Sequence, residues 1–117
     1  MIALAIALTV VLAAEYCFAP INLLTGRTIA NYQRFTGMPI WFAHRVLAPI
    51  KALTAGALIT GLAWRPASIA GAAASIAISL FYLARLARPG GRDGTGFAAF
   101  GLFGALSVAL LWIQLSR

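Results

Sequence analysis

The sequence has few charged residues. Only 9% of its 117 residues are charged, whereas 62% are hydrophobic. A soluble domain of this size carries about 25% charged and 45–50% apolar residues. The shortage of charge therefore excludes an ordinary water-soluble fold.

Residue types that build disulfides and metal sites are also scarce. The chain has one cysteine, Cys17, and one histidine, His44. A single cysteine cannot form an intramolecular disulfide, and one histidine cannot build a bis-histidine haem site or a three-histidine zinc site. The sequence shows no phosphate loop, nucleophile elbow or redox pair. It predicts no metal, no resident cofactor and no catalysis by this chain alone; a quinone or a bound lipid stays open as a ligand.

Basic residues outnumber acidic ones by nine to two. They stand at the ends of apolar segments and form no stripe or cluster of the kind that binds nucleic acid. Arginines in such positions are typical topology signals and contacts to lipid headgroups. Membrane lipids are therefore the expected partners, and nucleic acid is not.

Long hydrophobic runs fill most of the chain. Pro66–Ala84 and Gly94–Ser116 contain no charge at all, and 18 or more such residues can cross a hydrocarbon core of about 30 Å. Since lipid forces the backbone to satisfy its own hydrogen bonds, each run is expected to be a helix. The sequence predicts an all-α integral membrane four-helix bundle, a single domain over residues 1–117 with helices at about 2–24, 41–64, 67–86 and 95–115.

The link between the first two helices has a pattern of its own. Ile29, Tyr32 and Phe35 recur every three residues, with Arg34 on another face, and this spacing favours a short interfacial helix over about 28–35. An irregular loop with scattered aromatics is the alternative. Arg65–Pro66 is expected to be a tight turn, and residues 88–96 a flexible polar loop.

Arginine placement predicts the orientation. Six arginines flank the links between helices one and two and between helices three and four, against two on the other side. By the positive-inside rule, both links face the cytoplasm and both termini lie outside. We expect a multi-pass protein of a bacterial plasma membrane.

Small residues recur every four positions in three of the predicted helices. Such stripes let helices approach closely in lipid, so these faces either close the bundle or dock on another protein, unless the spacing is a chance result of the high alanine content. The positions singled out for packing are Gly56, Gly61, Gly71, Ser75, Gly101 and Ala105.

Two ionisable residues fall inside predicted spans. A charge at the centre of a membrane helix costs about 2.5–3.5 kcal/mol. At 1.5 Å per residue, Glu15 and Lys51 lie about 14 and 15 Å from the same membrane face. We expect them to form an intramembrane ion pair. The pair would set the helix register or act as a proton-linked or ligand-binding site; otherwise the two side chains point apart.

A second group of candidates lies near the predicted cytoplasmic face. These residues could surround a quinone or a lipid headgroup, or simply anchor the chain to lipid phosphates. They are His44, Arg45, Tyr82, Arg85 and Arg88.

Several short motifs, in order and spacing over about residues 10–90, resemble the DoxX-like family of small four-helix membrane proteins. They are Leu24–Gly26 (LTG), Tyr32–Pro39 (YQRFTGMP), Arg45–Lys51 (RVLAPIK), Ala55–Gly61 (AGALITG) and Trp64–Pro66 (WRP). The resemblance implies a four-helix fold. Among such proteins are a small subunit of a thiosulfate:quinone oxidoreductase and membrane partners of redox enzymes.

The first function expected is a non-catalytic accessory or structural subunit that docks on larger integral membrane proteins, such as a redox complex. The alternatives are a DoxX-type quinone-linked oxidoreductase subunit and a small proton-coupled transporter that uses Glu15. The second alternative rests on a likeness to small multidrug transporters in length, helix number and a glutamate in helix one. In such a cation pathway, Lys51 would repel the substrate.

Overall fold

The computed structural model describes residues 2–26, 29–87 and 94–116. Within these ranges the chain is helical and has no strand, which confirms the all-α prediction. The elements are α1 (Ile2–Thr25), α2 (Ile29–Thr36), α3 (Ile40–Phe42), the π-helical turn η1 (Ala43–Leu47), α4 (Ala48–Thr60), α5 (Arg65–Leu86) and α6 (Gly94–Leu115).

Four segments of the described chain are long and apolar enough to span a membrane. They are Ile2–Asn22, Ile40–Thr60, Arg65–Leu86 and Gly96–Leu115. The second segment runs through α3, η1 and α4 without a break in the helix. The protein is thus a multi-pass membrane protein with a four-helix bundle.

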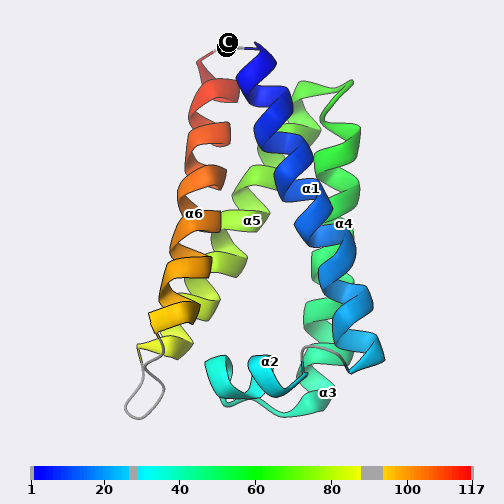
Figure 1. Ribbon diagram of the computed structural model, residues 1–117. Helices are drawn as coiled ribbons and strands as arrows, with labels where there is room; N and C mark the ends of the chain where they lie inside the picture. Colours follow the sequence, from blue (N-terminus) through cyan, green and yellow to red (C-terminus); the bar gives the residue numbers. More distant parts are fainter. Residues whose placement is uncertain (1, 27–28, 88–93, 117) are drawn as a thin grey trace.

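The long helices form a ring in which each packs on two neighbours. α1 lies against α4, α4 against α5, α5 against α6, and α6 against α1 (Figure 1). The start of α1 and the end of α6 lie at one end of the bundle, and α2 lies across the other end (Figure 1). The short helix between helices one and two is therefore confirmed as an element, and it occupies the end opposite the termini.

The turn between the second and third long helices lies earlier in the sequence than predicted. α4 ends at Thr60 instead of Trp64, and α5 begins at Arg65 instead of Ala67. A Cβ on Gly61 would lie only 2.5 Å from the Cα of Ser68, so the two backbones nearly touch here. The chain must reverse immediately after Gly61 to make this contact, and the turn occupies the residues that the prediction had given to the second helix.

A π-helical turn interrupts the second span before Pro49. The backbone N–H of Ala48 donates to the carbonyl of Ala43, five residues back. Pro49 has no N–H to donate to the carbonyl of Arg45, and a wider turn is a known way to accommodate such a gap within a helix. The π-helical form of this turn is known only from the structure.

The short helix α2 is closed by its own backbone and side chains. Gly37 has φ +64°, the left-handed conformation that commonly ends a helix, and its N–H donates to the carbonyl of Gln33 at 2.8 Å. The hydroxyl of Thr36 donates to the carbonyl of Tyr32 and accepts the N–H of Met38. These bonds hold α2 as a compact turn between α1 and α3.

Candidate functional site

A column of polar side chains runs along the inward face of α5. Ser68, Ser75 and Tyr82 are spaced seven residues apart, so they lie on one side of the helix, and all three are at most 2% exposed. Ser79 lies on the same side and is 1% exposed. α1 and α4 each contribute one partner to this column and α6 contributes two, so the polar groups lie in the middle of the bundle and not in a groove on its surface.

Lys51 of α4 joins this column through Tyr82. Its Nζ donates to the hydroxyl of Tyr82 at 2.9 Å and lies 4.6 Å from the centroid of the same ring. Lys51 is buried, with 6% of its surface exposed. The phenol oxygen and the ring face together stabilise a cation that would otherwise be costly among apolar side chains.

The predicted ion pair between Glu15 and Lys51 is not formed. Both residues are described, and the structure shows no direct ion pair between them. Glu15 is only half-buried, because the inward direction at this point of α1 is taken by Tyr16. The prediction placed both residues correctly in adjacent helices, but it could not know which way each side chain turns about its helix axis.

A chain of hydroxyls links α1, α5 and α6. The hydroxyl of Tyr16 in α1 lies 2.8 Å from Oγ of Ser75, which in turn lies 2.6 Å from Oγ of Ser107 in α6. The Ser107 hydroxyl donates to the carbonyl of Phe103 at 2.7 Å. In a medium without water such bonds are worth about 0.6 kcal/mol on average and up to about 1.7. The bond from Tyr16 joins α1 and α5, which lie diagonally across the ring, and the bond from Ser75 to Ser107 joins the neighbouring helices α5 and α6.

Two further buried polar residues, Gln114 and Ser79, lie on opposite sides of this row of hydroxyls along the bundle. Nε2 of Gln114 donates to Oγ of Ser68 at 3.1 Å, close to the end that carries the termini. The hydroxyl of Ser79 is buried and has no hydrogen-bond partner among the described residues. The polar column is therefore almost fully bonded internally, as expected for a structural core.

Sequence reasoning missed Tyr16, Ser107 and Gln114. Ser107 and Gln114 are the polar residues of an otherwise apolar span, and polar side chains within a span typically face the bundle interior. That signal was available. The partner of each one was not, because it depends on the rotation of every helix about its axis.

Aromatic rings pack around Tyr82. Its ring stacks on Phe100 with centroids 4.0 Å apart and an interplanar angle of 6°, and it meets Phe81 edge-on. Phe81 stacks on Phe42 of α3 at 5.6 Å. Tyr82 was predicted to face a quinone or lipid headgroup; the structure places it inside the bundle instead, bonded to Lys51 and covered by rings.

Arg85 connects α5 to the short helix α2. Its Nε donates to the carbonyl of Thr36 at 2.7 Å. Nearby, the hydroxyl of Tyr32 donates to the carbonyl of Pro39 at 3.0 Å. Burial raises the pKa of this phenol above its usual value of 10.0, although its contact with Thr36 and the charge of Arg85 act against the shift. Tyr32 thus stays neutral and remains a donor.

The remaining residues of the predicted headgroup cluster are His44, Arg45 and Arg88. His44 is half-buried and Arg45 is exposed, both on η1. Arg88 lies outside the described residues. Tyr82 and Arg85 are engaged inside the bundle and with α2, so Arg45 is the exposed residue among the described members of this cluster.

The predicted packing residues fall into two groups. Gly61 and Gly71 lie where helices touch: a Cβ on Gly71 would come within 2.9 Å of the Leu58 side chain. Ser75 is buried in the hydroxyl chain. The other three lie on the outer surface, with open space around Gly56 and Gly101; they are Gly56, Gly101 and Ala105. These three do not pack this bundle.

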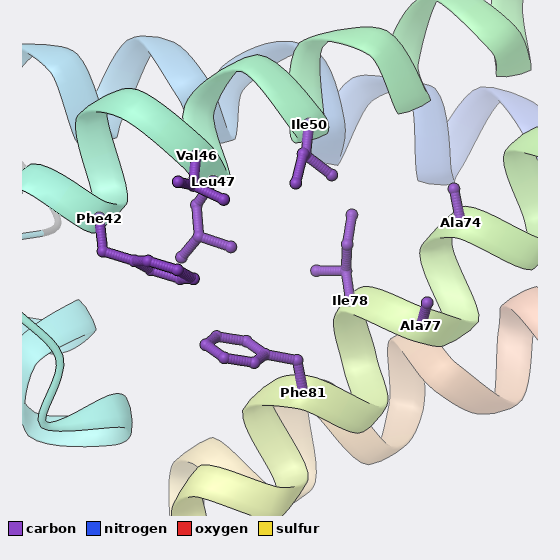
Figure 2. A pocket seen from close by; sticks show the side chains of 8 residues that line it. All are labelled: Phe42, Val46, Leu47, Ile50, Ala74, Ala77, Ile78 and Phe81. Atoms are coloured by element: carbon purple, nitrogen blue, oxygen red, sulfur yellow. The ribbon is translucent and has the colours of Figure 1, made fainter.

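Apart from the polar column, the described chain has an apolar groove of about 290 Å³ between α4 and α5. Residues from α3, η1 and α4 face residues of α5 across it (Figure 2). The two stacked rings, Phe42 and Phe81, form one end of the groove.

Taken together, these features define a class: a multi-pass four-helix membrane bundle with an internally bonded polar core. Comparison of the chain with protein-family models, with curated proteins and with solved structures found no match.

Proposed function

We propose that this chain is a non-catalytic accessory subunit of a larger membrane complex, and that the outer face of α6 docks on its partner. The observation that carries the proposal is the exposure of α6. Within its spanning segment, 22% of residues are buried inside the bundle, against 39–44% in the other three. α6 is thus the spanning helix with the smallest share of residues buried inside this chain.

The exposed face of α6 has the composition of a helix-packing surface. Gly101, Ala105 and Ala109 are all exposed and follow each other at intervals of four residues. Such small residues let a second helix approach closely, and close approach drives association where lipid supplies no hydrophobic force. Trp112 extends the same face and is 71% exposed. A large aromatic beside small residues offers both an anchor and a groove to a partner helix.

The interior of the bundle supports a structural role better than a catalytic one. The polar side chains of the column are bonded to one another, with Lys51 on Tyr82 and Tyr16 on Ser75. The DoxX-like motifs are in keeping with an association with redox complexes. The quinone-linked alternative would need a polar group facing the groove, and the groove's lining is apolar.

We further propose that the end of the bundle carrying α2 faces the cytoplasm of a bacterial cell and that both termini lie outside. The basic residues at this end support that orientation through the positive-inside rule. Alkaline phosphatase fused to the C-terminus, active only outside the cytoplasm, should be active; an inactive fusion of normal abundance would reverse the orientation.

The docking proposal is tested by isolating the tagged protein from its native membranes in mild detergent. The wild type should co-purify with another integral membrane protein in a fixed ratio. Ala105→Leu should lose that partner, because a larger side chain prevents close approach. Ala7→Leu, at a position of α1 that is also exposed, is the matched control and should keep the partner.

Three results would overturn the docking proposal. They are a wild type that purifies without a partner, a bound quinone that is reduced in turnover, and a stable homodimer that couples uptake to protons. The second favours the oxidoreductase alternative, and the third favours the transporter. Equal retention of the partner by both variants would remove α6 as the docking face.

A further inference from the structure

The groove between α4 and α5 opens on the outer surface of the bundle, and none of the residues that the structure describes fills it. Its walls carry branched and aromatic side chains that face each other, Ile50 opposite Ile78 and Phe42 opposite Phe81 (Figure 2). Ile50 is 40% exposed. The volume of about 290 Å³ is near the lower end of the range for small-molecule sites, about 300–1,000 Å³.

The groove covers less than half the length of the two helices. On the second span it extends from Phe42 to Ile50, eight residues or about 12 Å. Beyond it α4 and α5 close on each other, with Leu58 against Gly71 and Gly61 against Ser68. The helices therefore diverge from their connecting turn and leave a wedge at the end that carries α2.

The length and the apolar lining of the groove indicate which kind of molecule it can bind. A single leaflet is about 15 Å deep, half of the hydrocarbon core, so the groove spans nearly one leaflet from its surface inward. A partner helix, about 10–12 Å across and long enough to cross both leaflets, would meet the closed half of α4 and α5. A hydrocarbon chain that belongs to one leaflet fits the wedge and needs no polar partner within it.

A cationic side chain lies near the surface end of the groove. Arg45 is exposed on η1, one residue before Val46 in the lining. Trp41 is 56% exposed one turn earlier, as is typical of residues at the level of lipid headgroups. A phosphate bound to an arginine gains charge-assisted hydrogen bonds. A zwitterionic lipid offers the same phosphate but carries a compensating positive charge.

We propose that this groove is a binding site for one anionic phospholipid, with an acyl chain between α4 and α5 and the phosphate on Arg45. Only one leaflet can supply this lipid, the one at the α2 end. The site is separate from the outer face of α6, because α6 contributes no residue to the groove.

The experiment is native mass spectrometry of the purified full chain in detergent micelles containing phosphatidylglycerol or phosphatidylcholine at equal concentration. One phosphatidylglycerol should be retained, in preference to phosphatidylcholine by about fivefold, the effect expected of a single arginine near an anionic headgroup. Arg45→Gln should remove the preference. Arg65→Gln, an exposed arginine at the opposite end of the bundle, is the matched control and should leave it intact.

The groove itself is tested by filling it. Ala77→Trp should lower retention of phosphatidylglycerol severalfold, because the indole occupies the space of the acyl chain, whereas Ala7→Trp on α1 should not. If Ala77→Trp does not fold, Ile50→Trp fills the same space from α4. Equal retention of the two lipids by the wild type, an equal effect of both arginine variants, or full retention by a folded groove-filling variant would each overturn the proposal. Retention of a neutral isoprenoid quinone in place of the phospholipid would overturn it as well.

Discussion

The contact between Gly61 and Ser68 yields the sharpest stability prediction. A Cβ added at Gly61 would lie 2.5 Å from Cα and 2.6 Å from N of Ser68, whereas ordinary contact begins at 3.4 Å. The two backbones would therefore have to separate by about 0.9 Å. Ser68 is fully buried and bonded to Gln114, so it cannot move without disturbing α6.

Gly61→Ala should therefore lower the free energy of unfolding by about 1–3 kcal/mol, the range for overpacking a well-packed interior. The atoms in conflict belong to the backbone, so no side-chain rotation relieves them. Unfolding by sodium dodecyl sulfate in mixed micelles, followed by tryptophan fluorescence, measures the change; Trp64 lies in the turn beside the contact.

The control is Gly56→Ala in the same helix. Gly56 is exposed and has open space where the Cβ would go, so this variant should match the wild type or gain up to about 1 kcal/mol from helix propensity. If Gly61→Ala is as stable as the wild type, the close approach of α4 and α5 at their turn is not real and the reasoning fails.

Two further predictions concern the polar column. Tyr82→Phe should lower the free energy of unfolding by about 1–3 kcal/mol, because it keeps the stacked ring but leaves the Lys51 ammonium without its hydrogen bond. Lys51→Met removes the charge and should lower the free energy of unfolding by less. If the same unfolding assay finds Lys51→Met to be the less stable variant, the bond between Lys51 and Tyr82 is contradicted. Tyr16→Phe should lower the free energy of unfolding by about 0.5–1.5 kcal/mol, because it removes the hydroxyl that bonds to Ser75. A variant as stable as the wild type would show that this row of hydroxyls does not contribute to stability.

The sequence predicted the helices well and their contacts poorly. The four spans and the short helix near Tyr32 follow from where charge is absent and where aromatics recur. Lys51 was correctly singled out as a buried ion, but its partner was assigned to Glu15. A difference of one residue along α1 turns a side chain by about 100°, and this angle decides that Tyr16, and not Glu15, faces the interior.

The same limit applies to the small residues. Gly71 and Gly101 belong to stripes of identical spacing, yet Gly71 touches Leu58 and Gly101 lies on the surface. In a soluble protein the hydrophobic side of a helix points inward, but here lipid and the bundle interior are equally apolar. Hydropathy therefore cannot distinguish the two sides.

The sequence by itself determined that the chain crosses a membrane in four helices, because the lengths of its apolar runs match the thickness of hydrocarbon. It also predicted the short helix between the first two, because aromatic and aliphatic residues recur there every three positions. Only the tertiary structure decided which faces meet. It assigned Lys51 to Tyr82, closed α4 on α5 at one end and left a groove at the other. Those outcomes depend on helix rotation and backbone approach, and the packing of all four helices sets them jointly.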